Sequence, residues 1–124
     1  MQNAIVIGDR QSQLIAKMME LSQRRQQVIS HNLANANTPG YTRQDVNFGT
    51  QLQQALRAES TTDFDAIRPQ VVEDHESPAR LDGNNVEVPS EMGEMMQNGL
   101  TYQLLVKAFN TRTSILRMAM QGAN

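Results

Sequence analysis

Asn32-Leu33-Ala34-Asn35-Ala36-Asn37-Thr38-Pro39-Gly40-Tyr41 decides the fold, because these ten residues end a long helical pattern and turn the chain. The residue before a proline is disfavoured in helical conformation, so Thr38 marks a stop. Pro39 and Gly40 suit the two central positions of a type II β-turn, in which glycine supplies the positive φ. The sequence therefore predicts a helix that ends near Asn35, followed by a sharp corner.

The residues before this corner have the composition and periodicity of an amphipathic helix. Good helix formers such as Gln, Met, Leu, Lys and Arg dominate from Asp9 or Ser12 to about Asn35. Gly8 is expected to lie before the helix. Apolar side chains recur on one face, although two polar residues interrupt it. The predicted packing positions here are Leu14, Met18, Leu21 and Val28.

A second long helix is predicted from about Ser90 to Met120. About 30 residues make a helix roughly 45 Å long, which is too long for so small a domain to cover. Part of its apolar stripe is therefore expected to be exposed in an isolated molecule, and such a patch usually marks a contact surface. The predicted packing positions on this helix are Met92, Met95, Tyr102, Val106, Phe109, Leu116 and Met120.

The segment between the two helices is mostly polar and contains several prolines. A short helix is expected within 48–56, a turn at Asp82-Gly83, and a short extended piece at 86–88. For the rest of this segment we expect little fixed structure before assembly, because loops of such length are usually functional or disordered.

Together these elements predict an all-α fold. Its long N- and C-terminal amphipathic helices are expected to pair as a coiled-coil-like bundle, with a long irregular central loop. A length of 124 residues suits one domain. Its predicted regions are an N-terminal helical region at 1–35, a turn and mostly irregular segment at 36–89, and a C-terminal helix at 90–124.

Composition disfavours several classes of function. The net charge is −2 and no Lys/Arg cluster occurs, which disfavours nucleic acid as a partner. The chain has no Cys, so no thiolate can bind a metal. His75 lies among flexible acidic residues, and together they make only a weak candidate for a metal site. His31 follows a serine but lacks an acidic partner at a recognisable spacing. We expect no enzyme, no catalytic residue, no cofactor, no metal site, no cleaved signal peptide and no transmembrane segment.

Taken alone, the corner has a plain structural interpretation, but its residue order resembles a family signature. Asn, Thr, Pro, Gly and Tyr in order behind a helix resemble the motif of the bacterial flagellar rod and hook proteins. Three further stretches are similar to the proximal rod class of that family: Leu81–Val88, Glu91-Met92 and Leu100–Gln103. The motif residues in this chain are Asn32, Asn35, Asn37, Thr38, Pro39, Gly40 and Tyr41.

The resemblance implies a structural subunit of the proximal rod in the bacterial flagellum basal body. This rod is the hollow periplasmic drive shaft that transmits torque for motility, and its subunits are expected to assemble through their terminal helices. The expected route to the periplasm is the flagellar type III export apparatus, without a cleaved signal peptide. The expected partners are other copies of the chain, other flagellar rod proteins and a basal-body adaptor of the FliE type.

Two alternative interpretations stay open at this point. One is another flagellar rod subunit of the neighbouring proximal type, against which only the resemblance within 81–103 argues. The other is a small helical adaptor or export chaperone, which would share the Met-rich stripe but would not need the turn at Thr38–Tyr41.

Overall fold

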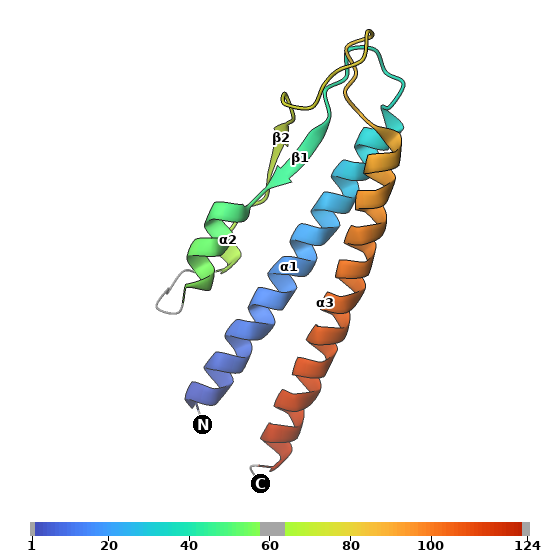
Figure 1. Cartoon of the computed structure of the whole chain (residues 1–124). Coiled ribbons are helices and arrows are strands. Elements are labelled where there is room, and N and C mark those ends of the chain that lie inside the picture. The colour runs from blue at the N-terminus through green and yellow to red at the C-terminus, as the bar shows by residue number, and fades with distance from the viewer. Residues whose placement is uncertain (1, 58–63, 123–124) are drawn as a thin grey trace.

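The computed structural model describes residues 2–57 and 64–122, and two long helices dominate it (Figure 1). Helix α1 spans Gln2–Ala34 and helix α3 spans Val88–Gly122. They lie side by side and antiparallel, so the two ends of the chain are at the same end of the molecule. The corner and the loop that precedes α3 lie at the opposite end.

Both helices begin earlier than the sequence pattern predicts. Helix α1 runs through Gly8, because a single glycine costs only about 1 kcal/mol relative to alanine within a helix. Helix α3 begins at Val88, so Ser90 lies inside its first turn instead of before it. Pro89 favours this earlier start, since its fixed φ suits the first turn of a helix. Val88 is consequently helical and does not belong to an extended piece.

Residues 44–57 and 64–73 form an arm beside the helices, and this arm corrects part of the predicted fold. The short helix expected within 48–56 is present. The prediction of an irregular central loop is wrong for these residues, because they form short helices and strands. In chain order the elements of the arm are strand β1 (Gln44–Asn47), helix α2 (Gly49–Leu56), the 3-10 helix η1 (Phe64–Ala66) and strand β2 (Gln70–Glu73).

The two strands pair antiparallel, with Val46 opposite Val71, so the fold is mostly helical but not all-α. The arm rests on the first half of α1 through a small cluster in which Ala55, Phe64 and Ile67 are buried. The sequence does not reveal the strands, because four residues of mixed polarity are too few to show an alternating pattern.

The contact between α1 and α3 combines apolar packing with a buried polar pair. Leu21 and Val28 of α1 are buried. Close to Leu21, Ser22 Oγ donates to Asn98 Oδ1 of α3 at 2.9 Å, and Asn98 Nδ2 donates to the Ser22 backbone oxygen at 2.8 Å. Pairing of the two helices is therefore observed, whereas regular coiled-coil packing is not established by it.

Candidate assembly site

The corner at the end of α1 has the predicted backbone geometry. Gly40 has a φ of +75°, and Tyr41 N donates to Thr38 O at 3.2 Å, which closes the turn. The Asn35 side chain donates from Nδ2 to His31 O at 2.9 Å and so satisfies a carbonyl at the end of the helix. Local residue preferences are thus sufficient to make this corner.

Asn84, in the loop before α3, fixes that loop to the corner. Its side chain is fully buried, and its Oδ1 accepts a hydrogen bond from Val86 N at 2.8 Å. Its Nδ2 faces three backbone oxygens at the end of α1, those of Asn35 at 2.9 Å, Ala36 at 3.1 Å and Thr38 at 2.9 Å. One side chain thereby ties together two segments that lie far apart in the sequence.

Three further contacts join the same two segments. Gly40 N donates to Asp82 O at 2.8 Å, and Arg80 donates from a terminal nitrogen to Ala36 O at 2.6 Å. A Cβ atom on Gly83, whose φ is +86°, would lie 3.3 Å from the Gly40 Cα, so the two turns touch through their backbones. We call residues 35–41 and 80–86 the tip.

Asn32 joins α1 to the first strand of the arm. Its side chain is 1% exposed, and its Oδ1 accepts hydrogen bonds from Tyr41 OH and from Gln44 N, each at 2.9 Å. Its Nδ2 donates to Gln44 O at 2.8 Å and to Glu91 Oε2 at 3.3 Å. The amide therefore uses both of its donors and both of its acceptor positions. Burial and then the Glu91 carboxylate raise the pKa of Tyr41, which keeps its hydroxyl a donor.

Arg43 is the centre of a charged cluster between the arm and α3. Its Nε pairs with Glu91, whose side chain is 1% exposed, and its terminal nitrogens lie 3.1 Å from Asp74 Oδ2 and 3.1 Å from Glu94 Oε2. Burial alone would lower the pKa of Arg43, but the hydrogen bond and ion pair with Glu91 raise it above its ordinary value. The guanidinium stays charged and neutralises a carboxylate that would otherwise be costly to bury.

Asp74 completes this cluster at the end of β2. Ser77 donates to it from Oγ at 2.6 Å and from its backbone N at 3.1 Å. These hydrogen bonds, chiefly the one from the Ser77 hydroxyl, hold the pKa of Asp74 at about 2. Asn85 accepts from Arg43 N at 2.5 Å and donates to Asp74 O at 2.6 Å, so it links this cluster to the tip.

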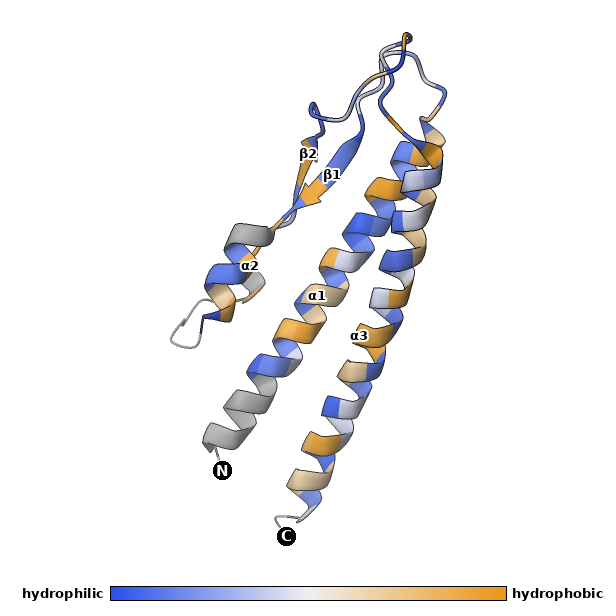
Figure 2. Ribbon diagram, viewed as in Figure 1, coloured by the Kyte–Doolittle hydropathy of each residue, from blue (hydrophilic) through white to orange (hydrophobic). Residues whose placement is uncertain are grey.

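Helix α3 keeps a second apolar face exposed. Asn98 and Tyr102 mark the face that contacts α1, because Asn98 bonds Ser22 and Tyr102 OH accepts from Gln23 Nε2 at 3.0 Å. Figure 2 shows hydrophobic residues distributed along the whole helix. Helical spacing places five large exposed ones on the side away from this contact, and Met92 at the edge of that side. We call these six residues the ridge: Met92, Met96, Leu100, Leu104, Ile115 and Met118, each between 48% and 72% exposed.

The residues predicted from the sequence fall into three groups. On α1, Leu14 and Met18 are half-buried, and Leu21 and Val28 are buried. On α3, the half-buried positions are Met95, Tyr102, Val106, Phe109 and Leu116, whereas Met92 and Met120 are exposed. In the motif, Asn32 is buried, Asn35 and Tyr41 are half-buried, and Asn37, Thr38, Pro39 and Gly40 are exposed. Which of these residues meet a neighbouring subunit stays a prediction.

Sequence reasoning singled out Asn32 and Asn35 but did not assign a role to Asn84, Glu91 or Arg43, which also fix the tip and the arm. Asn84 and Glu91 lie in the stretches on which the family resemblance rests, and that resemblance is the signal that could have identified them as important. Arg43 follows the motif by two residues, and no local pattern reveals its partners Asp74 and Glu94, which lie more than thirty residues away.

Neither a metal site nor a membrane span is found in residues 2–57 and 64–122. That part of the chain contains no group of three or more His, Cys, Asp or Glu residues able to hold a metal ion. His75 pairs with Glu73 at 3.1 Å, and both side chains are well exposed. None of its helices combines the length and the hydropathy needed to cross a bilayer.

Comparison with known proteins gives a consistent result for most of the chain. A family model described as flagella basal body rod protein matches residues 19–42, which contain the second half of α1 and the corner. The flagellar basal body rod protein FlgB of Cereibacter sphaeroides is 35% identical over 117 residues, covering 86% of this chain and 91% of that protein. FlgB of Bacillus subtilis is 33% identical over 79% of this chain and 83% of that protein. FlgB of Aeromonas hydrophila is 32% identical over 84% of this chain and 87% of that protein.

Proposed function

This chain belongs to the FlgB family of flagellar basal body rod proteins, and from that premise we propose that it forms the proximal part of the periplasmic rod. It is a structural subunit, in agreement with the sequence-based expectation that the chain is not an enzyme. The names of its relatives favour this class over the neighbouring rod subunit and over a small adaptor or export chaperone.

The observation that carries the proposal is that α3 has two apolar faces and only one of them is covered. Its own α1 covers one face, and the ridge remains in water on the other. Burying a large apolar side chain contributes about 1.5–3 kcal/mol, so six such residues give a neighbouring subunit a strong reason to pack there. We infer that the terminal helices of adjacent subunits pair in a coiled-coil-like manner and line the wall of the hollow rod.

The tip supplies the second property that a rod subunit needs, a fixed shape. Its hydrogen bonds join the end of α1 to the loop before α3, so each copy presents the same corner to its neighbours. Identical contacts that do not close on themselves generate a helical assembly. The proposed partners are other copies of the chain, other flagellar rod proteins and a FliE-type adaptor at the base, reached after export through the flagellar type III apparatus.

The test is complementation of cells that lack this chain, with swimming and rod formation as readouts. The wild-type chain is expected to restore both. Leu100→Asp, which places a charge on the ridge at a residue that is 62% exposed, is expected to abolish both while leaving the thermal unfolding midpoint of the purified chain unchanged. Leu100→Met keeps the position apolar and is the matched control, expected to behave as wild type. Normal swimming with Leu100→Asp would contradict a role of the ridge in assembly.

A further inference from the structure

The two strands of the arm form a sheet whose outer edges differ. Strand β1 lies between α1 and β2, and its outer edge is closed by side chains (Figure 1). Gln44 N donates to Asn32 Oδ1 at 2.9 Å, and Asn32 Nδ2 donates to Gln44 O at 2.8 Å. Val46 N donates to Asp45 Oδ1 at 2.8 Å. A further strand therefore cannot add beside β1.

The outer edge of β2 is open. Asp74 N donates to Arg43 O at 2.8 Å, so this pair is hydrogen-bonded across the sheet. Antiparallel strands alternate bonded and non-bonded pairs, which points the N–H and C=O groups of Val71 and Glu73 away from β1. Among residues 2–57 and 64–122 these groups have no other partner. All four residues of β2 are exposed, and such an edge is a template for another strand.

This edge is complementary to itself in one register. When two β2 strands lie antiparallel with Val72 at the centre, Val71 of each copy lies opposite Glu73 of the other, and the two pairs exchange four main-chain hydrogen bonds. A shift toward the N-terminus sets Glu73 opposite Pro69, which has no N–H to donate. A shift toward the C-terminus sets Glu73 opposite its own copy, where like charges repel. The central register alone uses every outward backbone group.

Charge favours the same antiparallel arrangement. Arg68 lies just before β2 and Glu76 lies just after it, and both are exposed. Within the described part of the chain neither side chain has an ion-pair partner, whereas Glu73 and Asp74 are already paired. Antiparallel pairing brings the basic end of each strand toward the acidic end of the other. A second copy therefore fits this edge in hydrogen bonding and in charge.

We propose that two copies of this chain pair through β2 and join their sheets into one of four strands, in the order β1-β2-β2-β1. The contact is two-fold symmetric and stops at two copies, because both outer edges are then the closed edges of β1. A rod whose subunits all point the same way has no such two-fold axis, so the pair is a form of the chain outside the rod. The inference goes beyond the proposed function and does not depend on it.

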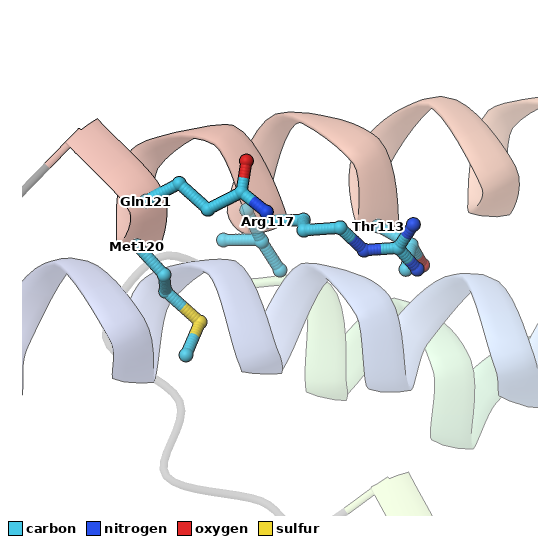
Figure 3. Close-up of a pocket in the computed structure, with 5 residues that line it drawn as sticks. Thr113, Arg117, Met120 and Gln121 are labelled. Atoms are coloured by element: carbon cyan, nitrogen blue, oxygen red, sulfur yellow. The ribbon is translucent and has the colours of Figure 1, made fainter.

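The contact leaves the two helices free. The ridge lies on α3 and not on the arm. A hollow of about 500 Å³ near the C-terminal end of α3, part of whose lining is drawn in Figure 3, also takes no part in the pairing. The pairing surface is a single short strand, so we expect a weak dimer that forms at high protein concentration.

Directed disulfide formation tests the contact, because the natural chain has no cysteine and any bridge must join two copies. In the proposed register the two Val72 residues form a non-hydrogen-bonded pair with Cα atoms about 4.5 Å apart, within reach of a disulfide. Concentrated Val72→Cys is therefore expected to cross-link at least tenfold faster than Gln70→Cys on oxidation. Gln70 is exposed on the same face of β2, but its two copies lie four residues out of register, about 14 Å apart.

Val71→Pro, added to the Val72→Cys chain, tests whether main-chain hydrogen bonds form the contact. It removes an N–H that points away from β1, so the bonds between β1 and β2 are kept. Cross-linking is expected to fall at least tenfold. Val71→Thr keeps the N–H and the branched shape, and is expected to cross-link like its parent. Circular dichroism of each variant verifies the fold, and the comparison of the two cysteine positions does not require the proline.

Three results would overturn the pairing. They are equal cross-linking rates for Val72→Cys and Gln70→Cys, an unchanged rate in folded Val71→Pro, and a Val72→Cys chain that stays monomeric at its highest soluble concentration. In the last case the open edge would be left for a strand of a different protein. Complementation with swimming as readout measures the rod function separately, so either conclusion can fail without the other.

Discussion

Asn84→Asp tests whether hydrogen-bond donors, and not shape alone, hold the tip together. The substitution replaces one NH₂ group by oxygen and leaves the size of the side chain nearly unchanged. In the wild type, Nδ2 faces three carbonyl oxygens within 3.1 Å, whereas in the variant an oxygen faces them. Nδ2 has two hydrogens, and each buried group that loses its partner costs about 1–3 kcal/mol. With the repulsion between oxygens, we expect a loss of about 3–5 kcal/mol at pH 7.

The loss of stability caused by Asn84→Asp should also depend on pH. Burial raises the pKa of an introduced carboxyl above its value in the unfolded chain. Below about pH 4 the carboxyl is protonated, and its hydroxyl replaces one of the lost hydrogen-bond donors. The stability that this form gives the variant is lost as the pH rises through the folded-state pKa. Relative to wild type at the same pH, Asn84→Asp should therefore be less destabilising at pH 4 than at pH 7.

Thermal unfolding followed by circular dichroism measures the effect. For a chain of this length, about 3–5 kcal/mol corresponds to a fall of roughly 10–20 °C in the unfolding midpoint. Asn37→Asp is the matched control, since Asn37 is exposed in the same turn, and a surface change of this kind is expected to stay within about 0.5 kcal/mol. Equal midpoints for the two variants at pH 7, or a larger loss at pH 4 than at pH 7, would refute the reasoning.

Three further predictions concern the corner, the charged cluster and the helix contact. A Cβ atom at either Gly40 or Gly93 meets nothing within 4 Å, so steric clashes do not decide the effect of alanine at these positions. Gly40→Ala should destabilise the chain by about 1–2 kcal/mol, because Gly40 has a positive φ, and Gly93→Ala should stabilise it by about 0.5–1 kcal/mol, because Gly93 lies in a helix. Urea unfolding measures both changes. The pKa of Asp74 falls from 3.8 to about 2 on folding, so its contribution to the stability of the fold is present above pH 4 and lost as the pH falls toward 2. Asp74→Asn should therefore flatten that part of the plot of stability against pH. An unchanged plot would contradict the role assigned to Asp74. A double-mutant cycle of Ser22→Ala and Asn98→Ala should give a coupling energy of about 0.5–3 kcal/mol, and strictly additive losses would show that the buried pair is not coupled.

The corner could be predicted from the sequence because its determinants are local. Thr38, Pro39 and Gly40 restrict their own backbone angles, and those restrictions are the same in any fold. Asn84 shows the opposite case, because its three carbonyl partners lie 46 to 49 residues earlier in the chain. Nothing in its immediate neighbourhood distinguishes a fully buried asparagine from an ordinary turn residue. Both turns of the tip, the corner and the turn at Asp82-Gly83, could therefore be predicted from the sequence, whereas the hydrogen bonds of Asn84 that join them could not.

Exposure of part of the α3 stripe was predicted from the sequence and is confirmed, but the side of the helix that stays exposed was not predicted. Helical periodicity identified Met95, Tyr102 and Val106 as one packing line, and these residues are half-buried beside α1. Apolar residues also occupy the other side of the helix, so periodicity alone does not decide which line the chain covers by itself. The position of Asn98, bonded to Ser22, settles this for the isolated chain. Leu100 and Leu104, which lie outside that packing line, remain exposed.

The tip and the ridge depend on different interactions, and this separates the effects of their substitutions. The tip buries little apolar surface, mainly at Ala36 and Val86, so its shape rests on directional hydrogen bonds that exist in one molecule. The ridge gains nothing until another chain covers it. Damage to Asn84 should therefore lower the stability of the isolated chain first and its assembly as a consequence. Damage to Leu100 should leave the isolated chain intact and appear only when subunits pack. A chain whose tip variants kept full stability but lost assembly would show that the tip, too, is completed by its neighbours.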